Sequence, residues 1–371
     1  MDLNAELERR YANVRVAMAA RELDALIVAG SEYTGFEGSV TYLSGFQIVH
    51  RYAYVVVPAD GDPLIVFPSE ARYVGEHGTA QLEQVFVDRP GAHIAERARA
   101  AGWKRVGVYG LDYVMTVRDY AALDGGLELV PFDVEFDLAR AVKTDAEIES
   151  VRDSVRINER GFEIFFDHYA EGRSAAEVMA AAEDYFVAEG CGRLTMNMVL
   201  TGPSGKALPE FKIARKEELL GDFMLPSLEI AGPGMHWVEV SRAIASRAGG
   251  WSEPTQQMLD AYEEYYEVAR TAMKTGATAH DVHRAVAKGF LDRGFRLGHV
   301  TGHSIGMTMI EFPKIGEGVE TELAANMIFS MHPHAIAADG TDCLYMQDTW
   351  LVTDGGGVPL TRLPMQIYAK G

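Results

Sequence analysis

Histidines gather near the C-terminal end of the chain. His299, His303, His332 and His334 fall within the stretch 299–334. His303 lies in GHVTGHSIG, where small neighbours let a ligand approach the backbone. His332 and His334 lie in MIFSMHPHAI, where strand alternation puts both on one face. A single histidine is more often a surface or core residue, so it is the cluster that indicates a polar site.

Two carboxylates and an amide lie in apolar segments of the same half of the chain. Glu229 is in LPSLEIAG, Glu239 in HWVEVSRAI and Gln347 in LYMQDTWLV. A glutamate is rarely buried unless it is paired, so each carboxylate requires a cation, a proton or a hydrogen-bond donor. These residues predict a polar cavity lined by strands, without fixing its chemistry.

Composition and missing motifs exclude several classes of protein. No glycine-rich phosphate loop occurs. The net charge of −20 disfavours nucleic acid and anionic membranes as partners. The N-terminus is no signal peptide, and the apolar runs are too short to span a bilayer. We therefore expect a cytoplasmic protein, with Cys191 and Cys343 reduced.

The first third of the chain alternates between helical and strand patterns. Short β-branched runs bounded by glycine, proline or aspartate predict buried strands, and helices are expected between them. The pattern is that of an α/β domain. Strands are expected over 25–30, 53–59, 63–68, 105–110 and 128–133, and helices over 3–22, 93–102 and 116–123.

The pattern changes around 133–147 to longer helices and strands. Capping boxes starting at Thr144 and Ser174 and a looser one at Thr278 predict helix starts, and Pro254 suits the first turn of another helix. The helices expected to begin at Thr144, Ser174 and Thr278 end near residues 170, 189 and 293. A further helix is expected over 254–274. Strands are expected over 194–201, 223–231, 236–246, 326–337 and 344–353.

Several segments, in order along the chain, resemble the creatinase, aminopeptidase P and methionine aminopeptidase superfamily, the pita-bread (peptidase M24-like) proteins. They are YLSGF (42–46), RYAYVVVPADGDP (51–63), VKTDAEI (142–148), GHSIG (302–306) and LVTDGG (351–356). The resemblance implies an α/β (α+β) fold. A creatinase-like N-terminal domain is expected over 1–138 and a pita-bread catalytic domain over 139–371.

The resemblance also identifies where this chain departs from its superfamily. The peptidases hold two divalent metals with Asp, Asp, His, Glu and Glu. The corresponding positions here are Glu229, Glu239, His303, His332 and Gln347, with the spacing between the two glutamates one residue short. Two close hard cations need several anionic oxygens, so we expect no metal. If one ion is held, Glu239, His303 and His332 form a triad suited to iron, zinc or manganese.

The expected activity follows the creatinase-like branch. The resemblance implies a small-molecule hydrolase that acts on a non-peptide C–N bond, with His303 as general base and acid. Glu229, Glu239, His332, Gln347 and His299 are expected to hold the substrate. Arg51 resembles the creatinase arginine that completes the partner's site, and this implies a homodimer.

Three other functions fit the same residues. A mononuclear-metal lyase, or another enzyme on a small acid, would use the triad of Glu239, His303 and His332. A non-catalytic binding module would need none of them, but a disused site drifts toward apolar residues and these replacements are polar. An ordinary Xaa-Pro aminopeptidase is the least expected, because the metal positions differ.

Overall fold

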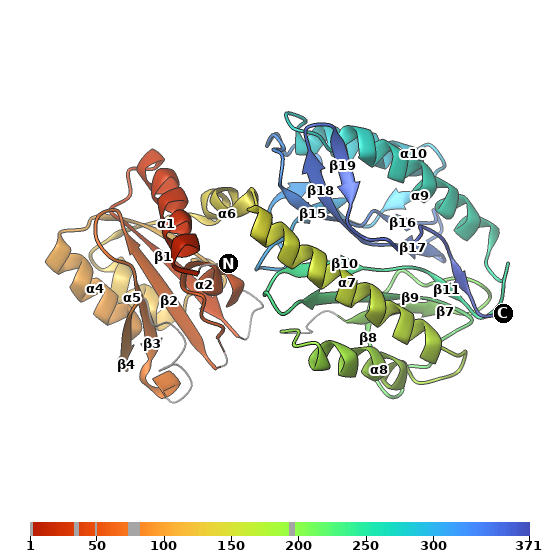
Figure 1. Cartoon of the computed structure of the whole chain (residues 1–371), viewed down its shortest axis with the longest axis horizontal. Coiled ribbons are helices and arrows are strands. Elements are labelled where there is room, and N and C mark those ends of the chain that lie inside the picture. Colours follow the sequence, from red (N-terminus) through yellow and green to blue (C-terminus); the bar gives the residue numbers. More distant parts are fainter. Residues whose placement is uncertain (1–2, 33–36, 49, 73–81, 193–196) are drawn as a thin grey trace. The chain divides into compact units, whose positions relative to one another are not determined.

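The computed structural model describes residues 3–32, 37–48, 50–72, 82–192 and 197–371 (Figure 1). The chain divides into two compact units. The N-terminal unit comprises Met1–Ala141 with Met307–Phe312, and the C-terminal unit comprises Val142–Gly306 with Pro313–Gly371. Across the described ranges, no helix is long and apolar enough to cross a bilayer.

The N-terminal unit is built on one mixed sheet with the strand order β4-β3-β2-β1-β5-β6. β1 pairs antiparallel with β2 and parallel with β5. The strands are β1 (Ala25–Ser31), β2 (Tyr52–Pro58), β3 (Leu64–Pro68), β4 (Glu83–Val87), β5 (Arg105–Tyr109) and β6 (Glu128–Pro131). The helices are α1 (Leu3–Ala20), α2 (Glu37–Ser44), η1 (Ser69–Ala71), α4 (Pro90–Ala101), α5 (Val117–Asp124) and α6 (Asp133–Ala141).

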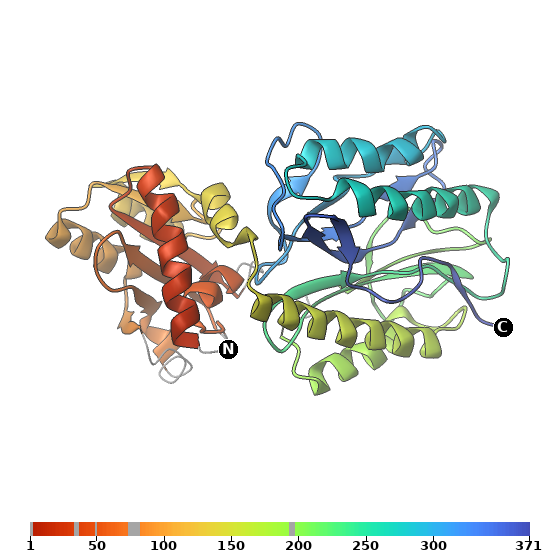
Figure 2. The same ribbon diagram turned by 45° about the horizontal axis from the view of Figure 1, so that its top comes forward.

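Helices cover both faces of this sheet (Figure 2). α1, α2 and α6 lie over one face, and α4 and α5 lie over the other. Every residue of β1 is consequently buried, which explains its continuous apolar sequence. The expected strands and the helices α1, α4 and α5 are confirmed. The sequence did not predict α2 or α6, and α6 occupies the segment where only a change of pattern was seen.

The C-terminal unit contains longer helices and shorter strands. Its helices are α7 (Asp145–His168), α8 (Ala175–Ala188), α9 (Glu253–Ala272) and α10 (Ala279–Leu291). Its strands are β7 (Met198–Gly202), β8 (Lys212–Ile213), β9 (Phe223–Ala231), β10 (Trp237–Val240), β11 (Ile244–Ala245), β12 (Arg296–Leu297), β13 (Gly302–Ser304), β14 (Glu311–Ile315, which begins in the N-terminal unit), β15 (Ile328–Met331), β16 (His334–Ile336), β17 (Cys343–Tyr345), β18 (Asp348–Thr353), β19 (Gly356–Pro359) and β20 (Tyr368–Ala369).

Helix pairs lie on opposite sides of the sheets in this unit (Figures 1 and 2). α7 packs against α8 and against β9 and β10, while α9 packs against α10, β17 and β19. The sheets have the orders β20-β11-β9-β7-β8, with β10 on β9, then β12-β16-β17 and β14-β13-β15-β18-β19. The strands that carry the predicted site residues therefore lie between two helical layers.

The helix starts were predicted with one error. Thr144 and Glu147 form the expected capping box of α7, and Thr278 caps α10. Ser174 precedes α8 as predicted, but its side chain makes no capping bond. The reason is that the first amides of α8 already donate to a neighbouring loop, from Ala175 to the Glu218 carbonyl and from Ala176 to the Arg215 carbonyl.

Three predicted long strands are broken. The expected strand over 236–246 divides into β10 and β11, the strand over 326–337 into β15 and β16, and the strand over 344–353 into β17 and β18. Pro333, which has no N–H to donate, lies at the second break. The predicted strand over 194–201 begins outside the described residues, and its described part is β7.

Candidate active site

Adjacent strands place the two glutamates side by side. β9 and β10 are antiparallel, and Glu229 and Glu239 are register partners. Opposed residues of such a pair share one face of the sheet. β13 and β15 bring His303 opposite Ser330 in the same way, and the Ser330 hydroxyl donates to Glu239 Oε2. Strand pairing alone therefore assembles most of the site.

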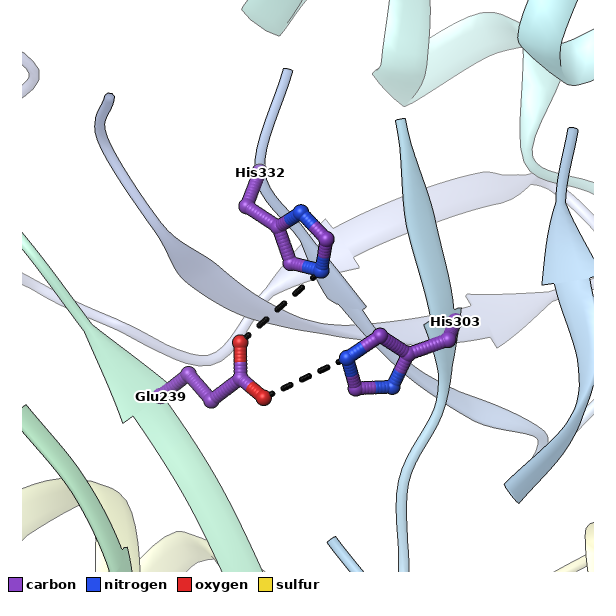
Figure 3. A group of neighbouring side chains, drawn as sticks. All are labelled: Glu239, His303 and His332. Atoms are coloured by element: carbon purple, nitrogen blue, oxygen red, sulfur yellow. Dashed lines mark ion pairs between the residues drawn. The ribbon is translucent and has the colours of Figure 1, made fainter. Parts of the chain in front are cut away.

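Glu239, His303 and His332 form a buried triad (Figure 3). His303 Nε2 lies 3.4 Å from Glu239 Oε1, and His332 Nε2 lies 4.0 Å from Glu239 Oε2. One ligand atom from each residue lies within 4.8 Å of the others. All three side chains are buried. Two imidazoles and one carboxylate at these separations are suited to one transition-metal ion.

The hydrogen bonding of His303 directs its other nitrogen at the carboxylate. Nδ1 donates to the Ser304 carbonyl at 3.0 Å, so in the neutral ring the Nε2 lone pair faces Glu239. Two lone-pair atoms at 3.4 Å repel each other unless a proton or a metal ion lies between them. Although burial opposes its charge, the carboxylate of Glu239 raises the pKa of His303 above its usual value.

The other two triad residues are shifted by the same environment. Burial opposes ionisation of Glu239, but the adjacent His303 lowers the pKa of this glutamate to about 2. Burial lowers the pKa of His332 to about 3, so its ring is neutral at physiological pH. Nδ1 of His332 is buried and has no hydrogen-bond partner among the described residues. The triad thus offers a cation an anionic oxygen from Glu239 and a neutral imidazole nitrogen from His332.

Gln347 lies between the two glutamates. Its Nε2 is 3.0 Å from Glu229 Oε1 and 2.9 Å from Glu239 Oε2. Ser227 Oγ is 2.8 Å from Glu229 Oε1. Burial and the charge of Glu239 raise the pKa of Glu229 to about 8, against the hydrogen bonds from Gln347 and Ser227. In the metal-free site Glu229 therefore carries a proton at neutral pH, and Glu239 carries the negative charge.

Two functional neighbours were missed by the sequence reasoning. Ser227 precedes Glu229 by two residues, and Tyr345 precedes Gln347 by two. Tyr345 Oη lies 3.1 Å from Gln347 Nε2. Because alternate residues of a strand point the same way, the position two residues before Glu229 on β9 was a usable signal for Ser227.

The remaining predicted residues lie elsewhere. The exposed ring of His299 stands 5.0 Å from that of His332 and 5.4 Å from that of His334, measured between centroids. Arg51 belongs to the N-terminal unit. There its side chain is about half exposed and pairs with Glu70 at 3.6 Å. The triad belongs to the C-terminal unit.

The site fits one metal ion and does not fit two. Glu239, His303 and His332 supply a complete set of three ligand atoms. A second ion next to Glu239 would need the oxygens of Glu229, and Gln347 already donates to both carboxylates there. An amide N–H₂ has no lone pair for a cation. The two glutamates are therefore bridged by hydrogen bonds.

Two family models of known proteins match most of this chain. Residues 149–354 match the model of metallopeptidase family M24, and residues 10–142 match that of the creatinase/prolidase N-terminal domain. The chain belongs to metallopeptidase family M24. A probable dipeptidase PepE of Mycobacterium tuberculosis is 26% identical over 368 residues, covering 95% of each chain. A Xaa-Pro dipeptidase of Pyrococcus furiosus is 24% identical and covers 63% of this chain and 67% of its own.

Solved structures share the whole fold of this M24 chain. Dipeptidase PepE from Mycobacterium ulcerans superposes with a TM-score of 0.81 at 23% identity, covering 100% of this chain and 99% of its own. The X-Pro aminopeptidase from Thermotoga maritima gives 0.82 at 18% identity, covering 97% and 99%. The expected creatinase-like N-terminal domain followed by a pita-bread domain is confirmed.

Two expectations from the sequence are wrong. The relatives are named dipeptidases, which contradicts a hydrolase for a non-peptide C–N bond. Membership of a metallopeptidase family, together with the buried triad, contradicts the absence of a metal. Two of the carboxylates that would bind a pair of ions are replaced in this chain, by His332 and Gln347. The expectation of no metal was wrong because Glu239, His303 and His332 still lie close enough together to bind one ion.

Proposed function

We propose that this M24 chain is a metal-dependent peptidase that cleaves dipeptides, with one divalent cation held by Glu239, His303 and His332. The observation that carries the proposal is the 3.4 Å approach of His303 Nε2 to Glu239 Oε1, with the other ring nitrogen committed to the Ser304 carbonyl. With Nδ1 donating to Ser304, His303 Nε2 and Glu239 Oε1 face each other as two hydrogen-bond acceptors, unless a proton or a cation lies between them. The dipeptidase names of the relatives support the substrate class.

The surrounding residues fix the ligands in place. Ser304 holds the His303 ring through Nδ1, and such partners orient metal-binding histidines in general. Ser330 and Gln347 both donate to Oε2 of Glu239, and this leaves Oε1 toward His303. A divalent cation bound there would supply Lewis-acid activation of the scissile carbonyl and of water.

Proton transfer is assigned to Glu229. Burial and the charge of Glu239 raise the pKa of its carboxyl to about 8 in the metal-free site. A group with a pKa close to the working pH can both give and take a proton. Ser227 Oγ contacts Glu229 Oε1 and keeps that oxygen turned toward Gln347. The exposed ring of His299, next to His332, is a candidate contact for the substrate.

Removal and return of the metal test the proposal. Protein dialysed against a chelator should lose dipeptide hydrolysis by at least about 10²-fold, as expected when Lewis-acid activation is lost. Addition of one equivalent of Mn²⁺, Zn²⁺ or Fe²⁺ should restore it. The measurement is release of free amino acids from a panel of dipeptides that includes Xaa-Pro members. Full activity of protein shown by elemental analysis to be metal-free would refute the proposal.

We also propose that the chain acts as a homodimer on its small-molecule substrate. Support comes from the match to the creatinase/prolidase N-terminal domain and from Arg51, whose side chain is about half exposed. Light scattering at micromolar concentration should give about twice the chain mass of 40.7 kDa. Arg51→Ala should raise KM more than it lowers kcat. A fully active monomer would show that no second chain is needed.

A further inference from the structure

A group that cannot bind a cation stands between the two buried glutamates. Gln347 Nε2 reaches Glu229 Oε1 at 3.0 Å and Glu239 Oε2 at 2.9 Å, and it carries two hydrogens and no lone pair. A cation bridging the same two oxygens would have to displace those hydrogens. The neutral amide of Gln347 thus bridges the two glutamates by hydrogen bonds, at the position where a second cation would bridge them by its charge.

The contacts of Gln347 leave its amide one orientation. Ser227 Oγ lies 2.9 Å from Oε1, and Tyr345 Oη lies 3.1 Å from Nε2. If the amide were turned over, Oε1 would meet the ionised Oε2 of Glu239, and two acceptors would face each other. The nitrogen therefore faces the carboxylates.

The backbone of Gln347 is also held firmly. It exchanges two hydrogen bonds of 3.2 Å with Ser241, and its carbonyl accepts from Arg242 Nη1 at 3.0 Å. The residue is fully buried. A side chain of the same length introduced at this position would therefore start from the same Cα and reach the same point.

We propose that Gln347 limits the site to one cation, and that its replacement by glutamate opens a second, oxygen-lined cation site between Glu229 and Glu239. The inference rests on the proposed function, because it takes the one-ion triad as its starting point. Glutamate has the shape of glutamine, so one introduced oxygen takes the position of Nε2. Three carboxylates then converge on one point, a donor set that suits Mn²⁺ or Mg²⁺.

The same substitution changes the stability of the metal-free protein. Without a cation, Q347E adds a third carboxyl group to a buried site that already holds the charge of Glu239. The added group is either ionised and repelled by Glu239 or forced to take up a proton, and it loses solvation in both cases. A cation that binds only the folded protein stabilises it by mass action. Metal-free Q347E should therefore melt below the metal-free parent, and Mn²⁺ should raise its melting temperature by more than it raises that of the parent.

Metal stoichiometry measures the inference directly. Parent, Gln347→Glu and Gln347→Met proteins are dialysed to equilibrium against Mn²⁺, and bound manganese per chain is measured by mass spectrometry. The expected ratios are one for the parent, two for Q347E and one for Q347M, which removes the amide without adding an oxygen. If Q347E is unfolded without metal, it is refolded in Mn²⁺ before the same measurement.

The outcomes separate the two proposals. Two ions in the parent, one ion in Q347E, two ions in Q347M, or failure of Q347E to fold even with Mn²⁺ would each overturn the role given to Gln347. Two ions in the parent would also overturn the single cation of the proposed function, but none of these results would affect the metal dependence of hydrolysis by the parent. No ion in the parent with one ion in Q347E would overturn the proposed function, and the gain of an ion would still support the assignment of Gln347.

Discussion

The variant His303→Ala should purify without its metal ion and hydrolyse dipeptides at least about 10²-fold more slowly, the upper end of the loss seen when a residue that merely supports a ligand is removed. His303 supplies one of the three ligand atoms and faces Glu239 at 3.4 Å. The remaining pair, Glu239 and His332, would hold a cation by one oxygen and one nitrogen only. Metal content and initial rate should therefore fall together.

A matched control distinguishes loss of the ligand from a general effect of removing a histidine. His168, in the last turn of α7, is exposed, and His168→Ala should keep the metal content and the rate of the parent. Added imidazole should restore part of the metal binding of His303→Ala, because it can fill the space left by the ring. A His303→Ala protein that retains its ion and most of its rate would show that chemistry occurs elsewhere.

Much of the fold could be predicted because local signals and burial agree. β1 is buried at every position, and its first six residues, ALIVAG, are continuously apolar. The start of α7 follows from the hydroxyl and carboxylate of Thr144 and Glu147, which cap it as the spacing predicts. At Ser174 the same pattern failed, because amides at the start of α8 donate to a distant loop. Tertiary contacts of this kind leave no local trace in the sequence.

The site was harder to predict, since two of its residues lie where regular strands end. His332 follows β15, and Gln347 lies between β17 and β18. Alternation along one continuous strand is therefore not a valid guide to where their side chains point. The residue types were informative, but the decision between no metal and one metal depends on distances of 3.4 to 4.0 Å among Glu239, His303 and His332. Sequence spacing does not determine such distances.

A large loss of stability is expected when a buried arginine of the N-terminal unit, far from the triad along the chain, is replaced. Arg140 on α6 donates to Asp137 at 2.7 Å and contacts Glu311 at 3.2 Å, and all three side chains are buried. Its Nη1 also donates to Thr308 at 3.0 Å. Thr308 and Glu311 belong to Met307–Phe312, the segment contributed by the second half of the chain. One guanidinium thus joins α6 to this segment.

Arg140→Met should lower the free energy of unfolding of the N-terminal unit by about 3–5 kcal/mol, the range measured when one partner of a buried ion pair is removed. Asp137 and Glu311 would remain buried as two like charges without the guanidinium between them. Replacement of all three residues, as Arg140→Met with Asp137→Asn and Glu311→Gln, should recover much of this loss, because the uncompensated charge disappears. Urea unfolding, with hydrogen exchange measured in β1 and β5, gives the free energies of unfolding of the single and the triple variant. A single variant within about 1 kcal/mol of the parent, the range of an exposed ion pair, would mean that the guanidinium contributes no more than a surface charge does.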